Sequence, residues 1–74
     1  MNRIVIEIDT EATFFLTGQV PVIKRFVLRS DKIKGLAEFF DGTVQLAIQV
    51  NETADIINIV PKNSFDEIAE FMTK

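Results

Sequence analysis

Cysteine and histidine are both absent from the 74 residues. These absences exclude a disulfide framework, a cysteine nucleophile and a structural zinc site. Without histidine, a general base working near neutral pH would have to be a carboxylate or lysine with a strongly shifted pKa. The sequence also lacks a nucleophile elbow, a Walker loop, a glycine-rich dinucleotide motif and an EF-hand loop. We therefore predict that the protein is not an enzyme and uses no cofactor.

Proline and glycine are scarce, with two and three copies, and no stretch rich in proline, glycine or serine marks a linker. We expect residues 1–74 to form a single domain. Hydrophobic residues make up 47% of the chain, which is enough to exclude global disorder. A domain of this size buries only about 60% of the surface that its unfolded chain exposes. Because small domains without disulfides or metals often gain stability by association, we predict a homodimer.

Long hydrophobic runs are also missing. The longest uncharged stretch, residues 12–23, is interrupted by Gly18 and Pro21 and is shorter than the roughly 20 residues that a membrane-spanning helix needs. The first apolar run, residues 4–8, contains Glu7 and does not resemble a secretory signal. These features predict a cytoplasmic protein that does not bind membranes.

The net charge is −3, and it is unevenly distributed. Residues 1–37 contain six basic and four acidic side chains, whereas residues 38–74 contain two basic and seven acidic ones. An acidic balance argues against binding of double-stranded nucleic acid, since such domains are usually basic. The two halves of the chain differ enough in charge to predict a polarised molecule.

Alternating hydrophobic residues predict strands at 2–9, 20–29, 43–51 and 56–60. Pro21 places the second of these at a sheet edge or a strand start, because proline cannot donate to a ladder. Residues 12–17 also resemble a strand, with a short helix capped by Thr10 as the alternative.

Two helices are expected, at 30–41 and 64–73. The first carries apolar residues at helical spacing, with Ser30 as a cap and Gly42 at its end. The second begins with a capping box formed by Ser64 and Glu67. The expected fold class is α+β, in the order β-β-β-α-β-β-α. An antiparallel sheet of four to five strands would have both helices on one face.

A basic segment at 24–34 is the first candidate site, with Lys24, Arg25, Arg29, Lys32 and Lys34. At the start of a helix, free N–H groups could help these side chains hold an anion. The alternative is a solvated basic face. Near the N-terminus, alternating Glu7, Asp9 and Glu11 suggest a weak cation site, but carboxylates at a turn are the preferred interpretation.

An acidic helix face and an uncharged strand are further candidates for partner binding. Asp66, Glu67 and Glu70 lie three or four residues apart, so they would share a face that suits a basic partner or simply solvent. Gln45 and Gln49 lie on the outward side of the 43–51 strand, which carries no charge. Such a strand is either central in its sheet or pairs with another chain.

All seven aromatic residues are phenylalanine. Phe14, Phe26, Phe40 and Phe65 fit the expected core, whereas Phe15, Phe39 and Phe71 fall outside it. The latter three would form an exposed interface patch, unless they belong to a second core layer.

We expect a small acidic protein-interaction or regulatory module, an adaptor or inhibitor that acts as a homodimer. The alternative is a single-stranded nucleic-acid-binding protein that uses residues 24–34 and a phenylalanine platform.

Overall fold

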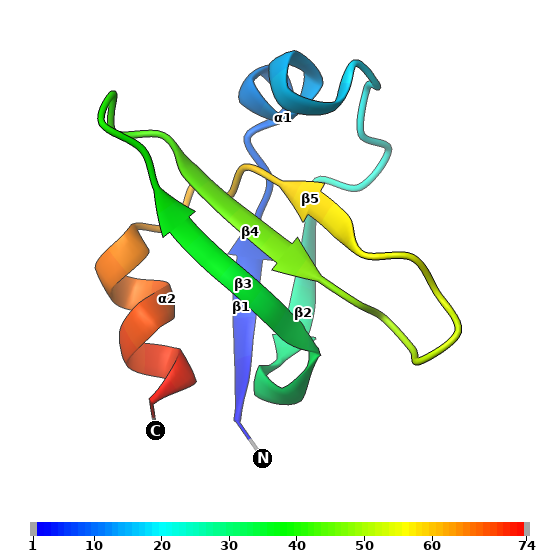
Figure 1. The fold of residues 1–74 in the computed structure, drawn as a ribbon, viewed down its shortest axis with the longest axis vertical. Helices are drawn as coiled ribbons and strands as arrows, with labels where there is room; N and C mark the ends of the chain where they lie inside the picture. Colours follow the sequence, from blue (N-terminus) through cyan, green and yellow to red (C-terminus); the bar gives the residue numbers. More distant parts are fainter. Residues whose placement is uncertain (1, 74) are drawn as a thin grey trace.

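The computed structural model describes residues 2–73 and is an α+β fold with antiparallel strands (Figure 1). Its strands form two sheets, ordered β1-β2 and β3-β4-β5, where a single sheet was expected. The elements in chain order are β1 (Arg3–Glu7), α1 (Thr10–Thr17), β2 (Arg25–Arg29), the 3₁₀ turn η1 (Ser30–Lys32), β3 (Ile33–Glu38), β4 (Val44–Ile48), β5 (Ile57–Ile59) and α2 (Phe65–Met72).

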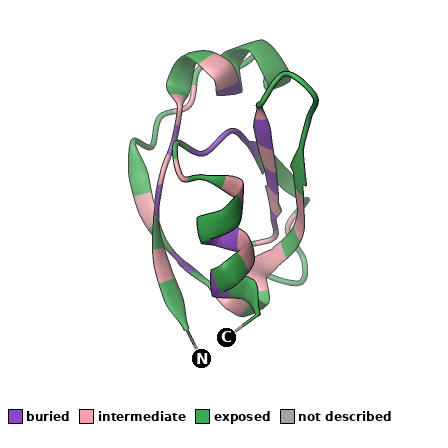
Figure 2. Cartoon of the chain, turned by 90° about the vertical axis from the view of Figure 1, so that its left-hand side faces the viewer, coloured by how far each residue is buried: buried purple, intermediate pink, exposed green. Residues whose placement is uncertain are grey.

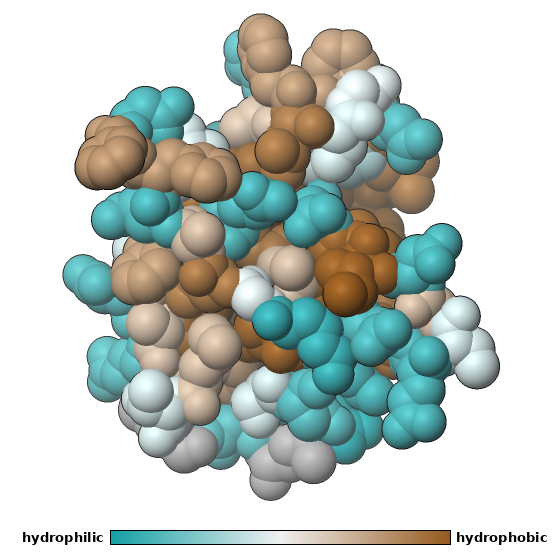
Figure 3. All heavy atoms as spheres, viewed as in Figure 1, coloured by the Kyte–Doolittle hydropathy of each residue, from teal (hydrophilic) through white to brown (hydrophobic). Residues whose placement is uncertain are grey.

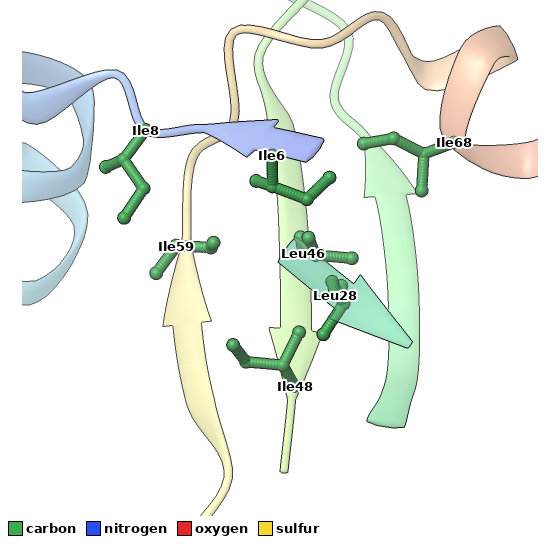
Figure 4. Close-up of a cluster of buried hydrophobic side chains, with 7 residues drawn as sticks. All are labelled: Ile6, Ile8, Leu28, Leu46, Ile48, Ile59 and Ile68. Carbon is green, nitrogen blue, oxygen red and sulfur yellow. The ribbon is translucent and has the colours of Figure 1, made fainter. Parts of the chain in front are cut away.

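The core lies between the two sheets, which cross one behind the other in Figure 1. Alternation along each strand directs one set of side chains inward. The buried cluster combines residues from both sheets with one residue of α2 (Figure 4): Ile6, Ile8, Leu28, Leu46, Ile48, Ile59 and Ile68.

The chain beyond β5 joins the two sheets. The N–H of Asp9 donates to the carbonyl of Val60 (2.8 Å), and the N–H of Lys62 donates to the carbonyl of Glu7 (2.7 Å). The amide side chain of Asn63 then accepts from the Glu7 N–H and donates to the Val5 carbonyl, both at 3.1 Å. One continuous segment therefore pairs first with β4 and then with the free edge of β1.

Residues 12–17 belong to helix α1, so the strand prediction for them is wrong and the helical alternative is confirmed. Asp9 caps this helix in place of Thr10, because its carboxylate accepts from the Ala12 N–H (3.1 Å). Gly18 ends it with a φ of 76°, a conformation that glycine adopts at little cost. The helix projects from one end of the molecule and is mostly exposed (Figure 2).

The helix predicted at 30–41 does not form. Only η1 is helical, and β3 follows it and pairs with β4. A tight turn then connects these strands: the Phe39 N–H donates to the Thr43 carbonyl (2.8 Å), and Gly42 adopts a φ of 89°. Asp41 accepts from the Thr43 N–H (2.9 Å). Asp-Gly between two apolar runs is a strong hairpin signal, so Gly42 belongs to a hairpin and does not end a helix.

The Asp41 turn predicts a pH dependence. The backbone N–H of Thr43, and after it the Thr43 hydroxyl, lower the pKa of Asp41 below its usual 3.8. A lowered pKa in the folded state contributes stability above the unfolded pKa, and this stability is lost as the pH falls through the lower folded value. Asp41→Asn keeps the acceptor oxygen but cannot titrate. Urea unfolding at pH 2 to 6 should show the advantage of the wild type over this variant shrinking below about pH 4. A difference that stays constant with pH would contradict the assignment.

Helix α2 is confirmed, with Ser64 accepting from the Glu67 N–H (3.1 Å). Its buried residues are Ile68 and Phe71, whereas Met72 is exposed. The prediction that Phe71 belongs to an exposed patch with Phe15 and Phe39 is therefore wrong, because Phe71 is buried.

Candidate functional site

An apolar groove of about 440 Å³ opens between the two sheets. Its walls come from β2, from the C-terminal part of β4 and from β5. Part of the lining is formed by the inward-facing residues Phe26, Leu28 and Ile48. The polar residues Lys32 and Gln49 also line the groove. The volume falls within the range of ligand-binding pockets.

Large hydrophobic side chains are exposed around this groove. Ile23, Val27, Val50 and Ile57 line it and retain between 46% and 62% of their accessible surface. Strongly hydrophobic atoms are visible on the right-hand half of the face in Figure 3, where Figure 1 draws β5. A contiguous exposed apolar surface of this kind is typical of an interaction site.

One edge of β2 is open along the groove. The N–H of Ile8 donates to the carbonyl of Lys24 (2.8 Å), and the N–H of Ser30 donates to the carbonyl of Asn2 (3.1 Å). With the register of β1 and β2, these bonds show that even-numbered residues of β2 exchange hydrogen bonds with β1. The backbone N–H and C=O groups of Arg25 and Val27 therefore point to the opposite edge, where no strand among residues 2–73 pairs with them.

The groove-facing edge of β5 is only partly covered. Just beyond β5, the backbone N–H of Val60 donates to the hydroxyl of Thr13 in α1 (3.0 Å), and the Val60 carbonyl accepts from the N–H of Asp9 (2.8 Å). Two residues earlier, at Asn58, no strand of the described chain pairs with this edge. The side chain of Asn58 instead accepts from Gln45 on β4 (3.1 Å).

The basic segment does not cap a helix, so the predicted anion site at a helix N-terminus is wrong. Arg29 and Lys32 line the groove, whereas Lys24, Arg25 and Lys34 are exposed and do not line it. Arg29 also forms an ion pair with Asp31, with 3.3 Å between Nε and Oδ1. This pair is exposed and contributes little to stability.

The acidic residues lie on a different element from the basic segment. Asp66, Glu67 and Glu70 are exposed on α2, which packs against β3 at the left of Figure 1, whereas the groove lies toward β2 and β5. Glu67 also accepts a hydrogen bond from the Asn63 amide. The predicted acidic and basic surfaces therefore do not form one site within a single molecule.

Strand β4 is central, between β3 and β5, so the alternative that it pairs with another chain is wrong. Gln45 donates across to Asn58, and Gln49 donates to the carbonyl of Ala54 (2.8 Å). Of the two glutamines, only Gln49 reaches the groove.

The exposed phenylalanines gather away from the basic segment. Phe15 of α1 and Phe39 of the β3–β4 hairpin line a separate hollow of about 410 Å³. Phe14 and Phe40 were expected in the core but are exposed. Phe26 is half-buried in the groove wall.

Two of the three carboxylates near the N-terminus have structural partners. Glu7 forms an ion pair with Lys62 (3.5 Å), and Asp9 caps α1. Among residues 2–73, no group of three acidic side chains lies close enough to hold a metal ion. In the same part of the chain, no helix has the length and apolar character needed to cross a membrane.

Arg29, Lys32 and Gln49 are predicted site residues that line the groove, whereas the hydrophobic residues of its lining were not predicted as site residues. Pro21 was the one signal that indicated an edge position for the strand that follows it. Comparison with protein-family models, curated proteins and solved structures found no match.

Proposed function

We propose that the chain is a small non-catalytic protein-interaction module that binds an extended segment of another protein in the groove between β2 and β5. The observation that carries this proposal is the conjunction of exposed apolar side chains, Ile23, Val27, Val50 and Ile57, with an open strand edge. An extended segment can use both features, since its backbone pairs with the edge and its alternate side chains enter the groove.

Single-stranded nucleic acid fits the groove less well. Binding of single strands depends on aromatic side chains on which bases stack. Phe15 and Phe39 line a different hollow, and the groove phenylalanine, Phe26, is half-buried. Homodimerisation stays a separate prediction, and sedimentation equilibrium would measure it.

Photo-crosslinking tests the proposed contact surface. A benzophenone side chain at Val50, which is exposed in the groove, should give a protein adduct of defined mass when it is irradiated in an extract of the source cells. Ile57→Glu should suppress this adduct, because a charge in the groove raises the cost of desolvation.

The same group at Met72 is the control, since this residue is exposed on α2, outside the groove. Equal adducts at both positions, no adduct at Val50 or an adduct with nucleic acid would each refute the proposal.

A further inference from the structure

We infer that the groove selects an acidic β-strand, which pairs antiparallel with the open edge of β2. This inference rests on the proposed function and specifies the chemistry of the partner. Three features of β2 carry it: the backbone groups of its edge, the alternation of its side chains and the charges at its two ends.

The backbone of β2 provides a template for one more strand. Arg25 and Val27 direct their N–H and C=O groups away from β1. An added antiparallel strand would exchange hydrogen bonds with these residues. Exposed edges of this kind are frequent sites of strand addition.

The side chains of β2 define what the added strand must carry. Alternation along β2 points Phe26 and Leu28 into the groove and Arg25, Val27 and Arg29 to the other face of the strand, although Val27 and Arg29 also border the groove. Residues directly opposite each other in neighbouring strands point to the same face. The residues of the added strand that lie opposite Phe26 and Leu28 therefore enter the groove. They have to be apolar, because the lining of the groove is mainly apolar.

The ends of the strand determine the preferred charge. Residues opposite Arg25 and Arg29 lie beside guanidinium groups, and the guanidinium of Arg29 also pairs with Asp31. Opposite charges at facing positions stabilise a sheet, and like charges destabilise it. The preferred segment has the pattern acidic, apolar, any residue, apolar, acidic.

A second copy of β2 is a poor occupant of this edge. Antiparallel pairing centred on Val27 would place Arg25 of each copy opposite Arg29 of the other, and parallel pairing in register would place like arginines together. Both arrangements juxtapose like charges. The charge pattern of β2 therefore favours a different chain with acidic residues.

A fluorescein-labelled peptide, Ser-Glu-Ile-Val-Ile-Glu-Ser with blocked ends, is a direct probe. Fluorescence anisotropy at low salt should show binding to the intact protein, and binding should be at least tenfold weaker when both Glu residues of the peptide are replaced by Lys. The double variant Arg25→Glu with Arg29→Glu should reverse this preference. Equal affinity of the wild type for the two peptides, or binding of neither, would overturn the inference.

Methylation of the peptide backbone provides a test that leaves the protein unchanged. In the antiparallel register, the N–H of the central Val faces β2, and the N–H of each Ile faces away. N-methylation of Val should weaken binding at least tenfold, whereas N-methylation of one Ile should not. Equal losses in both peptides would overturn the inference even if the charge-swapped protein failed to fold.

The two proposals fail separately. A specific adduct at Val50 together with peptides that show no charge preference would refute the acidic strand and leave the interaction module intact. Absence of the Val50 adduct would refute the module itself.

Discussion

Leu46→Ala is expected to leave much of the protein unfolded at 25 °C. Leu46 is fully buried at the centre of β4, where it packs in the cluster shared by both sheets. Removing a buried leucine side chain costs about 2–5 kcal/mol, since the cavity closes only in part. A single core in a domain of this size rarely supplies more than about 3–5 kcal/mol. Urea titration followed by circular dichroism would measure the loss.

Val5→Ala is the matched control, because Val5 is exposed on the outer face of β1. Its loss should be within about 0.5 kcal/mol, the usual effect of a surface substitution. If the two variants unfolded at the same urea concentration, Leu46 would not be a central contact.

Thr13→Val is expected to destabilise the junction between α1 and the sheets by about 1–3 kcal/mol, although the two side chains have similar shapes. Thr13 is buried, and its hydroxyl accepts from the Val60 N–H (3.0 Å) and donates to the Val60 carbonyl (3.3 Å). The carbonyl also accepts from the Asp9 N–H and keeps that bond. The Val60 N–H would lose its partner, and an unsatisfied buried donor has a cost of this size.

Thr13→Ser keeps the hydroxyl, so this variant should retain most of the folding stability that Thr13→Val loses. Hydrogen exchange gives a second readout, because the Val60 amide should exchange faster in the Val variant than in the Ser variant. Equal exchange rates in the two variants would show that the hydroxyl does not protect this amide.

Local patterns predicted the strands at 2–9, 43–51 and 56–60 and the last helix. Alternation and the Ser64 capping box depend only on near neighbours in the chain, so they are readable without knowledge of the fold. In the structure each of these segments is shorter than predicted.

The first predicted helix failed because a bulge imitates helical spacing. The register shifts between Ile33 and Gly35, so Ile33 and Leu36 both pack against the core although they are three residues apart in a strand. The same three-residue spacing is typical of one face of a helix.

The groove could not be predicted, because it depends on which strands remain unpaired. Its walls come from β2 and β5. Pro21 indicated an edge position for β2, but no local pattern shows that β5 also has an edge without a partner strand. The basic residues of the groove were visible from composition. In the sequence, the hydrophobic residues of the groove resemble residues of buried strands. Their exposure follows only from the order in which the strands pair.

The segment that joins the two sheets has a consequence for synthesis on the ribosome. Val5 and Glu7 obtain hydrogen bonds from Asn63, more than 50 residues later in the chain. The first strand can pair with the second soon after both emerge, but its other edge stays open until residues 60–63 leave the exit tunnel. Contacts of such long sequence separation slow folding. The nascent chain therefore exposes this edge of β1 until residues 60–63 emerge and cover it.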